Sequence, residues 1–101
     1  MKEIALCPRL SKAMELVGKR WTALIIYQLL EGPQRFNAIE SALPISGRLL
    51  SERLKELEKE GIVVRTVYSE VPIRVEYNLT DKGRSLEQAV REIETWAKNW
   101  L

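Results

Sequence analysis

Cys7 is the one cysteine among the 101 residues, and it directly precedes Pro8. Proline suits the first turn of a helix, because its missing N–H would have no partner there. We therefore expect Cys7 at or just before a helix N-cap, where the helix terminus and Arg9 would stabilise its thiolate. The alternative is a small buried hydrophobic residue. With no second cysteine, oxidation could join Cys7 only to the same residue of a second copy, within about 7 Å between Cα atoms, or to a small thiol.

Other catalytic chemistry has few candidates in this chain. It contains no histidine, which excludes Ser-His-Asp and Cys-His nucleophiles and histidine-based zinc sites. Glu56, Glu58 and Glu60 could pair as acid and base, but they alternate with Lys55 and Lys59, which favours a solvated helix face. The five glycines are isolated, so no glycine-rich phosphate loop is present. We expect no enzyme, no metal site and no cofactor.

Composition indicates one globular domain over residues 1–101, with 46% hydrophobic and 30% charged residues. The net charge of +2 and the sequence pI near 8.8 only lean toward nucleic acid. No apolar run approaches the roughly 20 residues of a membrane span, and the first residues lack the pattern of a secretory signal. We expect a cytoplasmic protein that does not enter membranes.

The elements that would position these residues follow from apolar spacing and helix-ending residues. We expect a first group of three helices over residues 9–17, 21–30 and 35–42. Gly18 ends the first helix, and Gly32-Pro33 ends the second. The third ends at Leu43, because a residue that precedes a proline avoids the helical region.

The second half of the chain predicts a helix, a hairpin and a long final helix. Ser46 is a good N-cap for a helix over residues 47–60, which Gly61 ends. β-branched residues favour strands over 62–68 and 73–79. The second strand alternates apolar and polar residues, as a half-buried strand does. Thr80 or Asp81 then caps a helix that continues to the end of the chain. The apolar positions of the helix over 47–60 are Leu50, Leu54 and Leu57.

This order predicts an α+β, mainly helical fold, a winged helix-turn-helix with a two-stranded wing. In such folds the second helix of the helix-turn-helix enters the major groove. Arg48 would reach guanine, Ser51 either base type, and Lys55 a phosphate. The predicted DNA-binding residues are Arg35, Ser46, Arg48, Ser51, Glu52, Lys55, Arg65 and Arg74.

Some of these residues have a second reading. Arg35 would bind phosphate at the start of its helix or simply be a solvated cap. Arg65 and Arg74 would reach a minor groove or phosphate from the wing, but Glu76 is an alternative cross-strand partner for Arg65.

The long C-terminal helix carries an apolar stripe that a domain of this size has little core to cover. We expect a homodimer seam there, and the alternative is an intramolecular lid. The tryptophans on apolar stripes would pack in the core or the seam more readily than they would stack on bases. The predicted interface residues are Leu10, Ala13, Val90, Ile93, Trp96, Ala97 and Trp100.

From residue 7 to its end, the chain resembles the HxlR-type winged-helix regulators, which are related to the MarR group. The matching elements, in order, are Cys7-Pro8, Val17-Gly18-Lys19-Arg20-Trp21, Leu24-Ile25, Gly32, Arg35-Phe36-Asn37, Leu49-Leu50 to Leu57, Gly61-Ile62-Val63, Val71-Pro72, Val75-Glu76-Tyr77, Leu79-Thr80 and Gly83. The resemblance implies a dimeric transcription factor that binds a pseudopalindromic operator, its recognition helices about 34 Å apart. Some family members use a cysteine at the position of Cys7 to detect electrophiles or oxidants.

Residues alone leave a second function class open, a winged-helix module that binds protein and does not read DNA. Its recognition face would be acidic or apolar. Arg48, Ser51 and Lys55 argue against this class, whereas Glu52 does not. No cluster of polar residues identifies a small effector.

Overall fold

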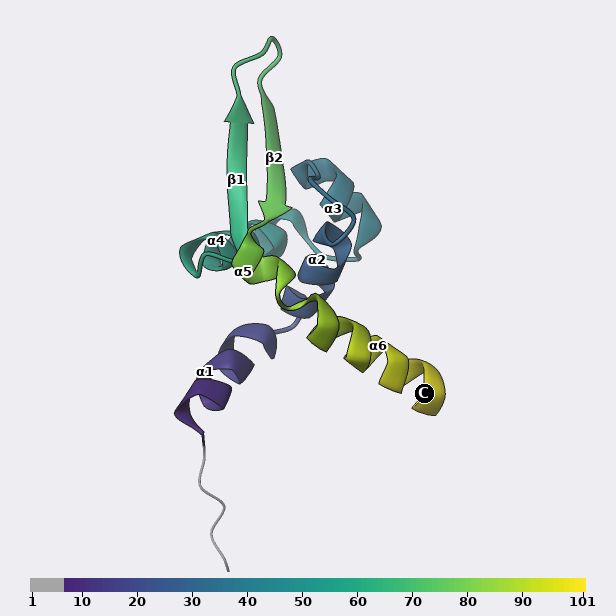
Figure 1. The fold of residues 1–101 in the computed structure, drawn as a ribbon. Coiled ribbons are helices and arrows are strands. Elements are labelled where there is room, and N and C mark those ends of the chain that lie inside the picture. The colour runs from purple at the N-terminus through teal and green to yellow at the C-terminus, as the bar shows by residue number, and fades with distance from the viewer. Residues whose placement is uncertain (1–6) are drawn as a thin grey trace, which may run out of the picture.

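The computed structural model describes residues 7–101, which form six helices and a two-stranded antiparallel sheet (Figure 1). The predicted α+β, mainly helical winged helix-turn-helix is confirmed. The elements in chain order are α1 (Pro8–Val17), α2 (Thr22–Leu29), α3 (Phe36–Ala42), α4 (Gly47–Lys59), β1 (Val63–Tyr68), β2 (Arg74–Leu79), α5 (Asp81–Arg84) and α6 (Glu87–Trp100).

The predicted starts of α1 and α4, and the predicted end of α4, are present in the structure. The Cys7 sulfur accepts the Leu10 N–H at 3.4 Å as the N-cap of α1, with Pro8 in the first turn. The Ser46 hydroxyl caps α4 by accepting the Leu49 N–H at 3.1 Å. Gly61 follows α4 with a φ of 73°, a backbone conformation that glycine adopts without a steric penalty.

The core lies between α2, α3 and α4 and extends to the base of the hairpin. The leucine stripe predicted for α4 is confirmed, because its three leucines are at most 1% exposed. Each face that these helices turn inward removes apolar surface from water, the main favourable contribution to folding. The residues of this core are Ile25, Ile26, Leu29, Ile39, Ile45, Leu50, Leu54, Leu57, Ile62, Val63 and Leu79.

The hairpin projects from this body as the wing (Figure 1). Val63 pairs with Leu79 at its base, where both are buried, and Tyr68 pairs with Arg74 near its tip. The alternation of burial predicted for the second strand is wrong: residues 74–78 are all intermediate in exposure, and only Leu79 is buried. In the described part of the chain, the hairpin strands contact the core through Val63, Tyr77 and Leu79, so solvent reaches both faces of the strand farther out.

A short backbone bridge fixes the wing to the helix-turn-helix. The N–H groups of Gln34 and Tyr77 each donate to the other residue's carbonyl, at 2.9 and 2.8 Å. Gln34 lies just before α3, so the bridge sets the position of this helix relative to β2. The start of α3 and the wing therefore belong to one surface.

The prediction of one uninterrupted final helix is wrong, because the structure divides it into α5 and α6. Thr80 caps α5, and its hydroxyl also donates to the Gly61 carbonyl at 2.6 Å. At the break, the Leu86 N–H bonds to the carbonyl three residues earlier, on Gly83, and the Ser85 hydroxyl donates to a carbonyl of the same turn. Leu86 itself packs against the core. This tightened turn changes the direction of the chain, so that α6 leaves the body (Figure 1).

Candidate DNA interface

The helix-turn-helix is built from α3, a four-residue connection and α4. Pro44 follows Leu43, whose extended backbone ends α3. Ile45 is 7% exposed and anchors the connection in the core. Ser46 then starts α4 by its cap. The connection therefore holds α4 at a fixed angle, with one face on the core and the opposite face in solvent.

The solvent-facing side of α4 carries the residues predicted to meet DNA. The Arg48 side chain is 92% exposed, and its Nε lies 3.7 Å from an oxygen of Glu52. Lys55 is exposed on the same face, and Ser51 is partly exposed beside it. An exposed ion pair of this length contributes little stability, so Arg48 can leave Glu52 at small cost. The sequence placed these four residues together, and the structure does so too.

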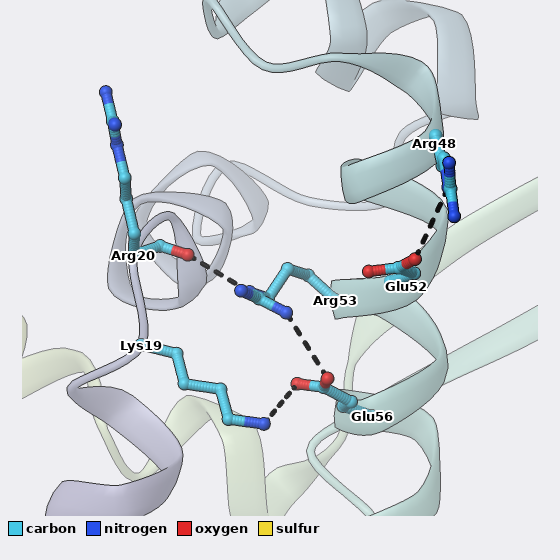
Figure 2. A network of polar contacts seen from close by, with 6 residues as sticks. All are labelled: Lys19, Arg20, Arg48, Glu52, Arg53 and Glu56. Atoms are coloured by element: carbon cyan, nitrogen blue, oxygen red, sulfur yellow. Dashed lines mark hydrogen bonds and ion pairs between the residues drawn. The ribbon is translucent and has the colours of Figure 1, made fainter.

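One flank of α4 carries a polar network that the sequence analysis did not predict (Figure 2). Arg53 donates from Nε to the Arg20 carbonyl at 3.1 Å and from Nη1 to Glu56 at 3.3 Å. Glu56 also forms an ion pair with Lys19, with 3.2 Å between Oε2 and Nζ. The Arg53 side chain is only 17% exposed. The network ties the turn between α1 and α2 to the middle of α4. Its only sequence signal was a charged residue beside the leucine stripe.

Arg35 and Arg65 are both exposed and unpaired in the part of the chain that the structure describes. Arg35 is the N-cap residue of α3, but its side chain makes no cap hydrogen bond. Arg65 lies opposite Tyr77 in the wing. Glu76, the alternative partner for Arg65, lies opposite Thr66 instead, so the register places the two side chains on opposite faces of the hairpin.

Arg74 is held inside the wing by other side chains. It bonds Glu70 through Nε and Nη2 at 3.2 and 3.0 Å, and Glu76 through Nη1 at 2.5 Å. Its guanidinium also lies 3.7 Å from the centre of the Tyr68 ring. The hydrogen bond from Arg74 is the main cause that lowers the pKa of Glu70, and the positive charge of Arg35 adds to it.

The residues predicted for a dimer seam lie on α1 and α6, which extend away from the core (Figure 1). Neither helix has a buried residue in the single chain. Leu10 and Trp96 are each 55% exposed, and Trp100 is 75% exposed. The intramolecular lid is therefore wrong for α6, because only Val90 at its start packs against the core. Ile93 is exposed too, whereas Ala97 is intermediate; Ala13 on α1 is exposed.

Cys7 is exposed at the start of α1, so the alternative of a buried hydrophobic residue is wrong for the single chain. Its sulfur is the capping atom of the helix. A thiol in this exposed position is reachable by an oxidant.

Two negative findings concern residues 7–101. They contain no group of three metal-ligating side chains that could hold an ion. They also contain no helix that is both long and apolar enough to cross a membrane.

Comparison with known proteins identifies the family to which this helix-turn-helix and wing belong. The family model of the HxlR-like helix-turn-helix proteins matches residues 16–101. An uncharacterised HTH-type transcriptional regulator of Bacillus subtilis, YvaP, is 56% identical over 100% of this chain and 94% of its own. The B. subtilis HTH-type transcriptional regulator YodB is 47% identical over 91% of this chain and 83% of its own.

Solved structures of relatives share this fold. The reduced form of YodB superposes with a TM-score of 0.84 at 45% identity, covering 95% of each chain. The redox regulator HypR in its oxidised form gives a TM-score of 0.86 at 38% identity, covering 92% of this chain and 96% of its own. With its helix-turn-helix, its wing and these relatives, the chain belongs to the HxlR-like helix-turn-helix family and is a DNA-binding transcriptional regulator, not an enzyme.

Proposed function

We propose that the protein binds a pseudopalindromic operator as a homodimer, with α4 of each copy in the major groove. The observation that supports this most is the solvent-facing side of α4, where Arg48, Ser51 and Lys55 are free of the core. The major groove of B-DNA, about 12 Å wide, admits one helix. Binding chromosomal DNA also implies a cytoplasmic protein.

Each residue of this face would have its own role. Arg48 would leave Glu52 and donate two hydrogen bonds to guanine O6 and N7. Glu52, once released, would accept from the amino group of cytosine. Ser51 would contact a base edge, and Lys55 a phosphate. The Ser46 hydroxyl would contact a phosphate beside the helix N-terminus.

Contacts outside α4 would come from the surface that the Gln34–Tyr77 bridge joins. Arg35 and Arg65 are exposed and would each bind a phosphate or enter the neighbouring minor groove. Arg74 would have to break its bonds to Glu70 and Glu76 before it touched DNA. We therefore propose that Arg74 stiffens the wing and that Arg65 makes the contact between the wing and DNA.

The homodimer is proposed because α1 and α6 leave large apolar side chains in water. Leu10, Ile93, Trp96 and Trp100 are all more than half exposed in the single chain. An exposed apolar surface of this kind favours association. A two-fold axis between the two copies would set the recognition helices about 34 Å apart, one turn of DNA.

A selection from a randomised duplex library tests this function directly. We expect the enriched sequences to contain an inverted repeat with half-site centres about 10 base pairs apart. At about 0.15 M salt, the selected duplex should bind about a thousandfold more tightly than a scrambled one. If no sequence is enriched, specific binding is excluded and the protein-binding class takes its place.

We also propose that Cys7 regulates DNA binding through its thiol. It is exposed, it caps α1, and α1 belongs to the proposed seam. Structures of the relative YodB exist in a diamide-treated and a quinone-bound form, which supports the proposal. Diamide would take up the two thiol hydrogens, becoming a hydrazine, while a disulfide forms between two Cys7 residues or between Cys7 and an added small thiol.

Oxidation should then change DNA affinity only when Cys7 is present. We expect diamide to release DNA from the wild type and not from Cys7→Ser, with reductant restoring binding. Mass spectrometry of the same samples would identify the disulfide. Equal release from both proteins would remove Cys7 from the mechanism.

A further inference from the structure

The turn between α1 and α2 has an unusual backbone for its sequence. Trp21 has a φ of 80°, in the left-handed region that bulky residues rarely adopt. Such conformations persist only where surrounding contacts hold them, and they often occur at functional sites. The residue presented by this turn is Arg20.

The contacts that hold the turn come from α4. The Arg53 Nε donates to the Arg20 carbonyl at 3.1 Å, and the Lys19 ammonium lies 3.2 Å from Glu56 (Figure 2). Arg53 and Glu56 also bond each other. These bonds involve the backbone carbonyl of Arg20 and the side chain of Lys19. The Arg20 side chain takes no part in them.

The Arg20 guanidinium is accordingly available. It lies 4.9 Å from the centre of the Trp21 ring, a contact that orients it without neutralising its charge. Arg20 is exposed, and no carboxylate of residues 7–101 pairs with it. By contrast, Arg48, Arg53 and Arg74 each have a carboxylate partner.

Its position relative to α4 indicates what it would meet. Figure 2 shows the Arg20 carbonyl facing Arg53 on α4, while the Arg20 side chain projects from the turn away from Glu56, in the direction of the end of α4 that carries Arg48. A helix in the major groove has a sugar-phosphate backbone on each side of it. A cation beside α4 would therefore face a phosphate and no base.

We infer that Arg20 is a DNA-contacting residue outside the helix-turn-helix, which binds a backbone phosphate beside the groove that α4 occupies. Arg53 is its positioning residue, since it fixes the Arg20 carbonyl to α4. This inference rests on the proposed docking of α4. It adds a third contact region to the recognition helix and the wing.

The salt dependence of binding tests it. The logarithm of the affinity falls with the logarithm of salt concentration by about 0.9 for each phosphate contact. We expect Arg20→Ala to reduce this slope by about 0.9 per copy bound, for the selected and the scrambled duplex alike. Arg20→Lys, which keeps the charge, should retain most of the slope. Lys98→Ala is the matched control, because it removes the same charge on α6, away from α4 and off the proposed seam stripe.

A double substitution tests the positioning by Arg53. We expect Arg53→Ala to reduce the slope in the wild type but to have no further effect on the slope in Arg20→Ala. A general loss of folding would not give this pattern. Circular dichroism melting of each variant would confirm that the proteins compared are folded.

The outcomes distinguish a failure of the Arg20 contact from a failure of the proposed docking of α4. If Arg20→Ala keeps the wild-type slope while Lys55→Ala reduces it, α4 docks as proposed and the role of Arg20 is wrong. If neither changes the slope, the docking of α4 itself is wrong. If Lys98→Ala reduces the slope as much as Arg20→Ala, the effect is one of net charge, and the Arg20 contact is again overturned.

Discussion

The hydroxyl of Tyr27 on α2 donates a hydrogen bond to the Glu94 carboxylate on α6, with 2.5 Å between the two oxygens. This bond connects the DNA-binding body to the helix that carries the proposed seam. It lies beyond the last α6 residue that packs against the core, Val90. The angle at which α6 leaves the body therefore depends on a polar contact, which solvent conditions can change.

The Tyr27 contact predicts a dependence on alkaline pH. Its hydrogen bond to Glu94 is the main cause that raises the pKa of Tyr27 above 10.0. A raised pKa in the folded state contributes stability that is fully present below pH 10 and is lost as pH rises through the folded value. We expect the melting temperature of the wild type to fall more steeply above pH 10 than that of Tyr27→Phe.

Absorbance at the phenolate band provides a second readout of this contact. The pKa of the Tyr27 phenol should lie above 10, and Tyr27→Phe should remove this component from the titration, whereas the control Tyr68→Phe should leave it in place. A high-pH component that survives in Tyr27→Phe would contradict the assignment.

The wing predicts a dependence on acidic pH. Arg74 lowers the pKa of Glu70 below 4.5, so this pair stabilises the wing above that pH and its contribution is lost as pH falls through the lowered value. Carbon NMR of the Glu70 carboxyl should give a midpoint below 4.5 in the wild type. The midpoint should return toward 4.5 in Arg74→Ala and by less in Arg35→Ala, whose charge is the smaller cause. An unchanged midpoint in Arg74→Ala would show that the ion pair does not form.

The proposed seam predicts an oligomeric state. Sedimentation should give the wild type twice its chain mass of 11.7 kDa. We expect Trp100→Ser combined with Leu101→Ser to give a monomer, since both side chains are at least 75% exposed in the single chain. Asn99→Ser beside them is the control and should remain dimeric. A double variant with the wild-type mass would place the interface elsewhere.

The core predicts a contrast between two isoleucines. Ile39 is completely buried, whereas Ile73 near the wing tip is 71% exposed. Ile39→Ala should lower the free energy of unfolding by about 2–5 kcal/mol, because it leaves a cavity. Ile73→Ala should change it by no more than about 0.5 kcal/mol. Urea denaturation measures both, and equal losses would contradict the position of the core.

Local signals predicted most of the fold. Ser46 and Cys7 define helix starts through hydrogen bonds that reach only three residues along the chain, so the sequence nearby contains all that is needed. The stripe of Leu50, Leu54 and Leu57 likewise shows its helical period directly.

Features that depend on distant partners were not predictable in this way. The left-handed Trp21 follows Arg20, whose carbonyl accepts a hydrogen bond from Arg53, 33 positions away, and the break before α6 follows from packing of Leu86 on the core. The sequence identified Arg74 as a cation, but its capture by Glu70 and Glu76 requires the turn of the wing. Arg20 has no local pattern that distinguishes it from a solvated arginine.

The most direct test of the central claim is the affinity of Arg48→Ala for the selected duplex and for a scrambled one. If α4 reads bases through Arg48, the variant should lose about 1–3 kcal/mol of discrimination at about 0.15 M salt, roughly 5- to 150-fold. Its binding to the scrambled duplex should change much less. Lys55→Ala, the phosphate contact, should instead weaken both by a similar factor. If Arg48→Ala keeps the full preference for the selected duplex, the solvent-facing side of α4 does not read the operator as proposed.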